Sequence, residues 1–200
     1  MSSQPSSELT LAQRQSDFTQ RLILQAAVEL LERASVGELT MRDVAARANI
    51  SERTVFRYFA TRDTFLDAVA TEVIGRLNMP PHPQTVKELL QLPAALYACF
   101  EAEASLVKAA LHSELFDRIR SAPAQQRWIA VRNLVDREAA GVVERRRMLA
   151  ATNVRYYLGA TTWHYYRFYF GFGPQETVDS AVMAIEQALA GVGIKLPRAK

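Results

Sequence analysis

The sequence contains little of what several large classes of protein depend on. A single cysteine, Cys99, excludes an internal disulfide and a metal site built from several thiolates. No apolar run approaches the roughly 18 residues of a membrane-spanning helix. The polar start MSSQPSSELTLAQRQ also lacks the apolar centre of a secretory signal. These absences lead us to expect a cytoplasmic protein with no membrane partner.

The motifs of common catalytic and metal sites are missing as well. The three histidines, His82, His112 and His164, do not share the i, i+4 spacing that brings two ligands to one helix face. The sequence contains no phosphate-binding glycine loop, no nucleophile elbow and no cluster of metal-ligating residues. We therefore predict a protein that is not an enzyme and that holds neither a metal nor another cofactor.

The composition is that of an ordinary folded chain, with 49% hydrophobic and 22% charged residues, and the net charge of +3 does not by itself identify a polyanionic partner. Apolar residues recur at helical spacing from Phe18 to about Ala34, which predicts a first helix. Thr40, Ser51 and Thr61 are typical N-cap residues, so three short helices should follow one another. Strand-like segments are too short to form a sheet, and we predict an all-α fold.

The segment NMPPHPQ, residues 78–84, divides the chain, because its three prolines cannot continue a helix. It separates an expected disordered tail (1–15) and a compact N-terminal domain (16–77) from a second helical domain (84–192). The helices of the second domain are expected at roughly 84–104, 105–120, 123–142, 147–170 and 175–190. We expect Pro93 to kink the first of these, and Pro123 and Pro174 to begin two others.

Residues 40–59 have the pattern of two helices joined by a short turn at Asn49 and Ile50, which is the geometry of a helix-turn-helix. Val55 and Phe59 lie four residues apart and would dock the second helix on the first. The outward side of that helix would then present side chains suited to a DNA groove, namely Arg53, Thr54, Arg57 and Tyr58. The alternative is that these arginines form an ordinary solvated surface.

Residues 16–77 resemble the DNA-binding domain of the TetR family of bacterial repressors. The resemblance rests on the first helix and on the segments LTMRDVAARANISERTVFRYF and ATRDTFLDAV. The positions that fit the family pattern are Thr40, Val44, Ala45, Ser51, Thr54, Phe56, Tyr58, Phe59 and Arg62. The resemblance implies an N-terminal three-helix helix-turn-helix DNA-binding domain and a C-terminal helical domain for ligand binding and dimerisation.

The resemblance also implies roles for individual side chains on double-stranded operator DNA. The chain departs from the family at Arg53, where many members carry glycine, and at Phe56, where many carry a phosphate-binding tyrosine. We expect contacts to phosphates from Thr40, Tyr58 and Arg62, and contacts to base edges from Arg53, Thr54 and Arg57. Ser51 would meet either a phosphate or a base edge, and Arg42 completes the expected set of DNA-binding residues.

A helix-turn-helix unit usually binds a two-fold site as a dimer, and residues 147–190 offer a candidate surface. The segment NVRYYLGATTWHYYRFYFGFG is rich in aromatic residues and apolar on two sides, as expected for a helix packed between its own subunit and a partner. The expected homodimer interface consists of Tyr156, Gly159, Ala160, Trp163, Arg167, Val182, Ile185 and Leu189. The alternative is that the whole stretch forms the core of a single subunit.

The resemblance further implies a pocket for a small-molecule effector in the C-terminal domain. Candidates for its lining are Tyr97, Phe100, His112, Phe116, Trp128 and Tyr165. The alternative for each of the aromatic residues is ordinary core packing.

These observations predict a DNA-binding transcriptional regulator, a repressor, that binds a near-palindromic operator as a homodimer. A small molecule would release it by favouring a state that does not fit DNA. Two alternatives come from other classes: a helical scaffold protein that acts through protein interactions, and an all-α enzyme with an N-terminal appendage. The arginines predicted to face outward argue against the scaffold, and the missing catalytic motifs argue against the enzyme.

Overall fold

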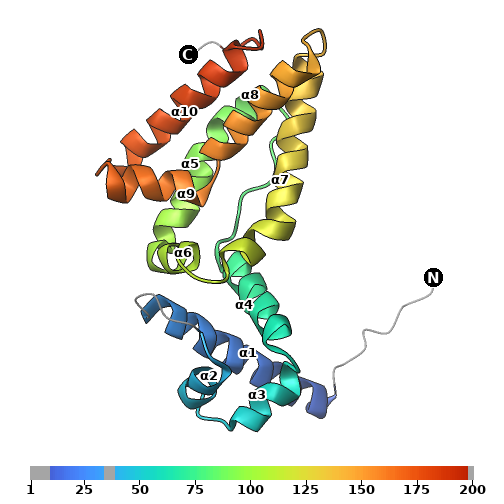
Figure 1. Ribbon diagram of the computed structural model, residues 1–200, viewed down its shortest axis with the longest axis vertical. Coiled ribbons are helices and arrows are strands. Elements are labelled where there is room, and N and C mark those ends of the chain that lie inside the picture. Colours follow the sequence, from blue (N-terminus) through green and yellow to red (C-terminus); the bar gives the residue numbers. More distant parts are fainter. Residues whose placement is uncertain (1–9, 34–38, 198–200) are drawn as a thin grey trace, which may run out of the picture.

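The computed structural model describes residues 10–33 and 39–197, and for residues 120–124 only the path of the backbone. Within these ranges the chain contains helices and no strand, so the all-α prediction is confirmed. Figure 1 shows an elongated molecule with α1 to α4 at one end and the longer helices of the second domain at the other. The elements are α1 (Leu11–Arg33), α2 (Met41–Arg47), α3 (Glu52–Tyr58), α4 (Arg62–Arg76), α5 (Val86–Ala102), α6 (Ala104–Leu111), α7 (Phe116–Glu138), α8 (Glu144–Tyr157), α9 (Ala160–His164), the π-helix η1 (Tyr165–Tyr169) and α10 (Pro174–Ala190).

The short helices of the first domain begin at hydroxyl side chains. The side-chain oxygens of Thr40, Ser51 and Thr61 accept hydrogen bonds from backbone N–H groups three residues further on, at 3.1, 3.1 and 3.2 Å. Each bond satisfies a donor that the first helical turn leaves without a partner, and each cap is worth about 1 kcal/mol. The three predicted N-caps are confirmed.

Helix α1 begins at Leu11, so the prediction of a disordered tail is wrong for residues 11–15. A capping box explains this start: the Gln13 N–H donates to the Thr10 hydroxyl at 3.3 Å, and the Thr10 N–H donates to the Gln13 side chain at 2.8 Å. Residues 1–9 and the end of the first helix predicted at about Ala34 lie outside the described residues.

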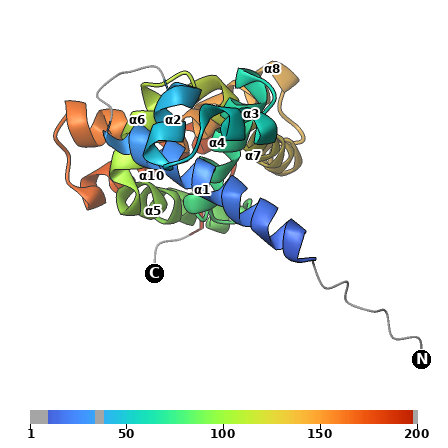
Figure 2. The ribbon, with the colours of Figure 1, turned by 90° about the horizontal axis from the view of Figure 1, so that it is seen from below.

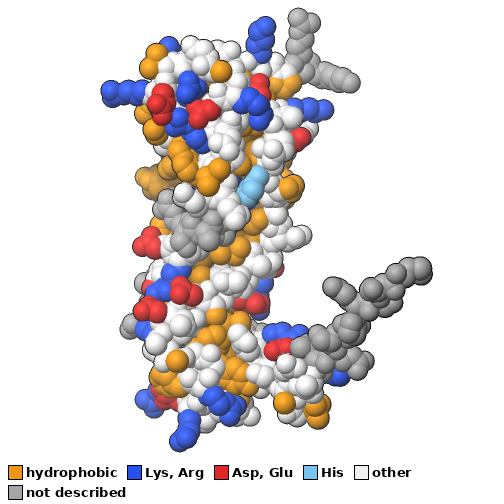
Figure 3. Space-filling model, turned by 90° about the vertical axis from the view of Figure 1, so that its right-hand side faces the viewer, with side chains coloured by type: hydrophobic (Ala, Val, Ile, Leu, Met, Phe, Trp, Pro, Cys, Tyr) orange, Lys and Arg blue, Asp and Glu red, His pale blue; other side chains and the backbone are white. Residues whose placement is uncertain are grey.

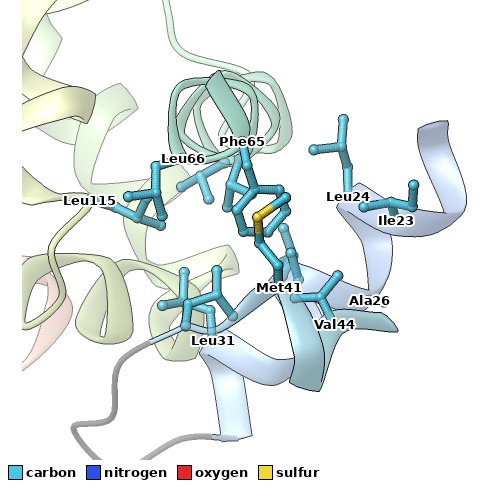
Figure 4. Packing of buried hydrophobic residues seen from close by; sticks show 14 of the residues in the cluster. Ile23, Leu24, Ala26, Leu31, Met41, Val44, Phe65, Leu66 and Leu115 are labelled. Carbon is cyan, nitrogen blue, oxygen red and sulfur yellow. The ribbon is translucent and has the colours of Figure 1, made fainter. Parts of the chain in front are cut away.

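The core of the first domain extends beyond the segment that the sequence assigns to it. Figure 4 shows Met41 and Val44 of α2 and Phe65 of α4 gathered with Ile23 of α1. Leu115, from the turn before α7, joins the same cluster and has no exposed surface. Because burial of one such side chain is worth about 1.5–3 kcal/mol, this contact ties the two domains together.

In the second domain, the single helix expected at 147–170 is interrupted. Helix α8 ends at Tyr157, and α9 and η1 follow as separate elements. Gly159 adopts extended backbone angles (φ −96°, ψ 149°) that an α-helix cannot contain. The Tyr156 carbonyl, released from its helical partner, accepts a hydrogen bond from the Thr162 hydroxyl at 2.7 Å.

The prolines of the second domain met the predictions in part. Pro174 is the first residue of α10, as predicted, where its missing N–H leaves no bond unmade. Helix α7 begins at Phe116, so position 123 lies inside the helix and the start predicted there is wrong. Pro93 lies within α5.

No helix in the described ranges has both the length and the apolar character needed to cross a membrane. The same part of the chain contains no group of three or more His, Cys, Asp or Glu side chains placed to hold a metal ion.

Candidate nucleic-acid interface

The turn between α2 and α3 sets the direction in which α3 leaves the first domain. Asn49 has a φ of 54°, in the left-handed region that asparagine tolerates better than most residues. The Asn49 N–H donates to the Ala46 carbonyl at 3.2 Å, and the Ile50 N–H donates to the Ala45 carbonyl at 3.0 Å. These bonds form a Schellman motif, which ends α2 and lets Ile50 pack against the core.

The exposed face of α3 combines cations, hydroxyls and one aromatic ring. Val55 on the opposite face is fully buried, which fixes the orientation of the helix. Arg53 and, on α2, Arg42 are exposed and make no hydrogen bond or ion pair with any residue in the described ranges. Figures 2 and 3 show that α1, α2 and α3 form this end of the molecule and that basic side chains gather there. A shallow depression on α3 is lined by Ser51, Arg53, Thr54, Phe56 and Arg57.

Tyr58, predicted to contact a phosphate, lies where α3 meets α1. Hydrogen bonding to Thr19, and then to Ser16, lowers the pKa of the Tyr58 phenol. The Arg57 guanidinium lies 5.3 Å from the centroid of the Tyr58 ring, a favourable cation–π distance. The half-buried phenol therefore lies beside α1, and its contact with a phosphate stays a prediction.

The first turns of α1 are part of this surface, and sequence reasoning missed them because it assigned residues 1–15 to a tail. A second depression runs between Arg14 and Phe18 of α1 and the Arg57 and Tyr58 side chains of α3. Figure 2 shows α1 projecting past the rest of the domain. The Thr10–Gln13 pair, a capping-box pattern, was the signal that could have located this start.

Two other predicted phosphate contacts are engaged within the protein. The Arg62 guanidinium donates to the Leu39 carbonyl at 2.8 Å and forms an ion pair with Glu114 at 2.5 Å. The Thr40 hydroxyl donates to the Asp43 carboxylate at 2.5 Å. Arg62 thus joins the helix-turn-helix to the second domain, and this geometry does not support its assignment to a phosphate.

A cavity of about 120 Å³ lies where the second domain meets α4. Most of its wall is apolar and includes Val73 and Leu77 of α4 and Phe116 of α7. Arg155 of α8 and Thr161 of α9 supply polar groups. Phe116 is therefore the one predicted pocket residue that lines this cavity.

The other five predicted pocket residues lie elsewhere. Tyr97 and Phe100 are buried in the core of the second domain. The Tyr97 hydroxyl donates to a backbone carbonyl at the end of α8 at 2.5 Å, and burial raises the pKa of Tyr97. Trp128 packs partly against the same core, whereas His112 and Tyr165 are exposed. Residue spacing identified apolar helix faces but could not show which side chains enclose an empty volume.

The predicted dimer residues also divide between the interior and the surface. Trp163, Ile185 and Leu189 have no exposed surface and belong to the subunit core, so a partner cannot contact their side chains. Gly159 and Ala160 line the cavity. For the three buried side chains the structure corrects the expected interface, whereas the half-buried Gly159 and Ala160 stay predicted contacts.

Arg167, another predicted dimer residue, is held inside its own subunit by Glu101. Glu101 pairs with Arg167 and also accepts a hydrogen bond from the Trp163 indole N–H at 2.8 Å. Burial raises the pKa of Glu101, but the hydrogen bonds from Arg167 and Trp163 outweigh it and leave the pKa below its ordinary value. The charges of Arg167 and Glu101 therefore stabilise the subunit itself.

Exposed apolar residues remain on α8 and α10. Tyr156 is 60% exposed and Val182 is half-buried, as a partner surface requires. Leu149 and Met183, each 57% exposed, lie on the same two helices and were missed by sequence reasoning. The seven-residue spacing of Leu149 and Tyr156, which places them on one helix face, was the available signal.

A helix-turn-helix with an exposed basic face, attached to a helical domain that contains a cavity, defines the class of helix-turn-helix DNA-binding proteins. Residues 23–69 match the family of bacterial regulatory proteins, tetR family. An HTH-type transcriptional regulator of Saccharopolyspora erythraea is 37% identical over 63 residues, 32% of this chain and 27% of that protein. An HTH-type transcriptional repressor of Mycobacterium tuberculosis is 30% identical over 69 residues, 34% of this chain and 37% of that protein. The matches thus span less than two fifths of either relative.

Solved structures share the fold over most of the chain. A TetR-like transcriptional regulator from Rhodococcus sp. RHA1 superposes with a TM-score of 0.58 and 14% identity, covering 92% of this chain and 100% of that one. Mycobacterium smegmatis BioQ superposes with a TM-score of 0.53 and 21% identity, covering 86% and 97%. In the segment that contains the helix-turn-helix, residues 23–69, the chain is thus similar to the tetR family of bacterial regulatory proteins. Its relatives are transcriptional regulators and not enzymes, in agreement with the prediction made from the missing catalytic motifs.

Proposed function

We propose that this protein is a transcriptional repressor that binds a near-palindromic operator as a homodimer and leaves it when a small molecule binds. The observation that carries the proposal is the exposed face of α3, where Arg53 and Arg57 stand beside the hydroxyls of Ser51 and Thr54. Arginine binds guanine through two hydrogen bonds in the major groove, and hydroxyls hold phosphates. One of the relatives is described as a transcriptional repressor.

The proposed contacts with DNA are assigned to side chains of α2 and α3 that are exposed to solvent. Arg53 and Arg57 point outward from α3 and would meet base edges. Arg42 lies exposed on α2, and we assign its guanidinium to a phosphate contact. Phe56 is 46% exposed and cannot replace the hydroxyl of a phosphate-binding tyrosine, so we assign it to an apolar contact with a thymine methyl group.

The homodimer would form through the exposed faces of α8 and α10. Leu149 and Tyr156 on α8 and Met183 on α10 are large, apolar and exposed. Burial of an apolar side chain at an interface removes it from water and is worth about 25 cal/mol per Å². These residues replace the buried Trp163, Ile185 and Leu189 as the proposed contacts.

The cavity gives a physical route from a bound ligand to DNA. Val73 and Leu77 belong to α4, the helix that follows the helix-turn-helix, and both line the cavity. A ligand that fills the cavity contacts α4 and favours one position of that helix relative to the second domain. Ligand and operator would then weaken each other's binding by the same factor.

The proposal is tested by fluorescence anisotropy with labelled DNA from the region that flanks the protein's own gene. Arg53→Gln should weaken binding by about 1–3 kcal/mol and relax the preference at one base pair. The matched control is Arg137→Gln, an exposed arginine on α7 that should leave DNA affinity unchanged. Binding with no preference for any sequence would instead favour the helical scaffold alternative.

A further inference from the structure

The second domain contains an arginine that the proposed function leaves unexplained. Arg127, on α7, is 5% exposed. Its Nε atom is buried and has no hydrogen-bond partner among the residues that the structure describes. A guanidinium carries its charge at neutral pH, and a buried charge is costly unless the protein or a ligand supplies a partner.

Arg155 lies across from Arg127 on the neighbouring helix. Helices α7 and α8 run antiparallel, and Asp136 of α7 pairs with Arg147 of α8 at 2.7 Å. Arg127 lies nine residues before Asp136 on α7, and Arg155 lies eight residues after Arg147 on α8. The register of the two helices therefore brings the two guanidinium groups to the same level.

The surroundings of Arg127 disfavour its positive charge. Burial, and then repulsion from Arg155, lowers the pKa of Arg127 to about 10. The one influence that raises the pKa of Arg127 comes from Cys99. No carboxylate of the described residues therefore contributes to the shift. The nearby carboxylate of Asp136 is already paired with Arg132 and Arg147.

Arg155 also connects this level to the cavity, since its side chain forms part of the cavity wall. The rest of the wall is mainly aliphatic and aromatic, including Val107, Leu111 and Phe116. A ligand with a negative head and a compact apolar body would match this arrangement. Arginine is the side chain best suited to bind a carboxylate through two parallel hydrogen bonds.

We propose that Arg127 and Arg155 bind the carboxylate of a small organic acid, whose apolar body occupies the adjoining cavity. The cavity volume of about 120 Å³ is close to the roughly 150 Å³ of an engineered cavity that holds benzene. The ligand is therefore a small aromatic or branched aliphatic carboxylic acid. The effect of this acid on DNA binding rests on the proposed function, whereas the binding of the acid to the protein does not.

Binding is measured on the full-length protein by calorimetry and by thermal unfolding. The probes are benzoate, phenylacetate and 4-methylpentanoate, and benzamide serves as the uncharged analogue of benzoate. At least one acid should bind and raise the unfolding temperature, and benzamide should do neither. Binding of benzamide as strong as that of benzoate, or no binding by any of the three acids at millimolar concentration, overturns the proposal.

The test of the residues uses Arg127→Met, which keeps the length of the side chain and removes its charge. This variant should bind the acid about tenfold more weakly or worse, as expected for the loss of a charge-assisted hydrogen bond. The unfolding temperature of the ligand-free variant should stay the same or rise, because a buried charge without a partner has been removed. Arg137→Met, an exposed change on the same helix, should leave acid binding unaltered.

A purely structural role for Arg127 predicts the opposite pattern. Arg127→Met would then unfold at a lower temperature and bind the acid as the unaltered protein does, which overturns the proposal. If that variant does not fold, Arg127→Lys replaces it and should bind the acid more weakly because lysine lacks the two-pronged donor geometry. Acid binding unchanged in the lysine variant likewise counts against the site.

The same samples separate this inference from the proposed function. Operator binding without any response to the acids leaves the repressor proposal standing and removes the anion site. Acid binding that depends on Arg127, in a protein that binds no DNA, leaves the anion site standing and removes the repressor proposal.

Discussion

Arg118, at the start of α7, forms ion pairs with two residues of α4, Asp67 at 2.6 Å and Asp63 at 2.5 Å. Hydrogen bonding to Asp67, and then to Asp63, raises the pKa of Arg118. The ion pair between Arg62 and Glu114 lies at the same junction. Helix α4 is therefore held to the second domain by charges as well as by the apolar contacts of Leu115.

We expect Arg118→Gln to weaken operator binding several-fold while leaving the helix-turn-helix folded. Without these ion pairs α4 would be held less firmly in the free protein. The entropy lost when α4 becomes ordered on DNA would then weaken binding. Anisotropy measures the affinity, and circular dichroism checks the helix content. Arg137→Gln, whose partners Glu138 and the Gln84 carbonyl both lie outside α4, is the control. Equal affinities for the two variants would show that the Arg118 contacts do not position α4.

The salt dependence of DNA binding should distinguish Arg42 from Arg62. Arg42 is exposed, so Arg42→Gln should weaken binding to every DNA sequence and reduce the slope of log affinity against log salt by about 0.9. Arg62 is held by Leu39 and Glu114, so Arg62→Gln should leave the slope unchanged. A reduced slope for Arg62→Gln would show that this side chain leaves Glu114 and reaches a phosphate on DNA.

Asn49 should respond to substitution according to its backbone conformation. Its φ of 54° suits glycine and disfavours a β-branched residue. Asn49→Val should therefore destabilise the protein by about 1–2 kcal/mol, whereas Asn49→Gly should be neutral or stabilising. Urea unfolding compares both with Asn133→Val, an exposed helical position where the change costs a few tenths of a kcal/mol. Equal losses at positions 49 and 133 would contradict the role of the turn.

Local chemistry made the first domain predictable. Thr40, Ser51 and Thr61 are caps whose geometry depends on residues three positions away, and the turn at Asn49 uses only backbone bonds within α2 and the turn. Such features can be read from the sequence because all the partners are close along the chain. The start of α1 obeys the same logic, and it was missed because the polar composition of the segment was given more weight than its capping pattern.

Long-range partners could not be predicted. Arg62 was expected to meet DNA, and nothing near it in the sequence indicates that Glu114 is its partner. Trp163 was expected at a dimer surface because apolar spacing shows that a face is buried, but not by which chain. The break at Gly159 had a local signal, the glycine itself, which was assigned instead to the dimer interface.

The pH dependence of stability should report on His164. Burial, and then the neighbouring His112 and Lys108, lowers the pKa of His164 from its ordinary value of 6.5. The unfolded chain therefore takes up this proton at a higher pH than the folded protein does. The contribution of neutral His164 to the free energy of unfolding is fully present above about pH 6.5. It is lost as the pH falls through the lowered pKa.

We thus expect the unfolding temperature to be lower at pH 5.5 than at pH 7.5, and the difference to shrink in His164→Phe. Phenylalanine retains a ring beside Phe168, which lies 5.1 Å from the imidazole between centroids. Scanning calorimetry at both values of pH gives the comparison. A difference of the same size in the variant would assign the pH dependence to other groups.

The central claim, that α3 reads a two-fold DNA site, is tested most directly by selecting bound DNA from a random double-stranded pool with the full-length protein. We expect an inverted repeat whose half-site centres lie about 10 base pairs, or a multiple of that, apart. Arg53→Gln should change the selected base at one position of each half-site. A pool that stays random after repeated selection, or a single half-site without its inverted copy, would contradict the claim.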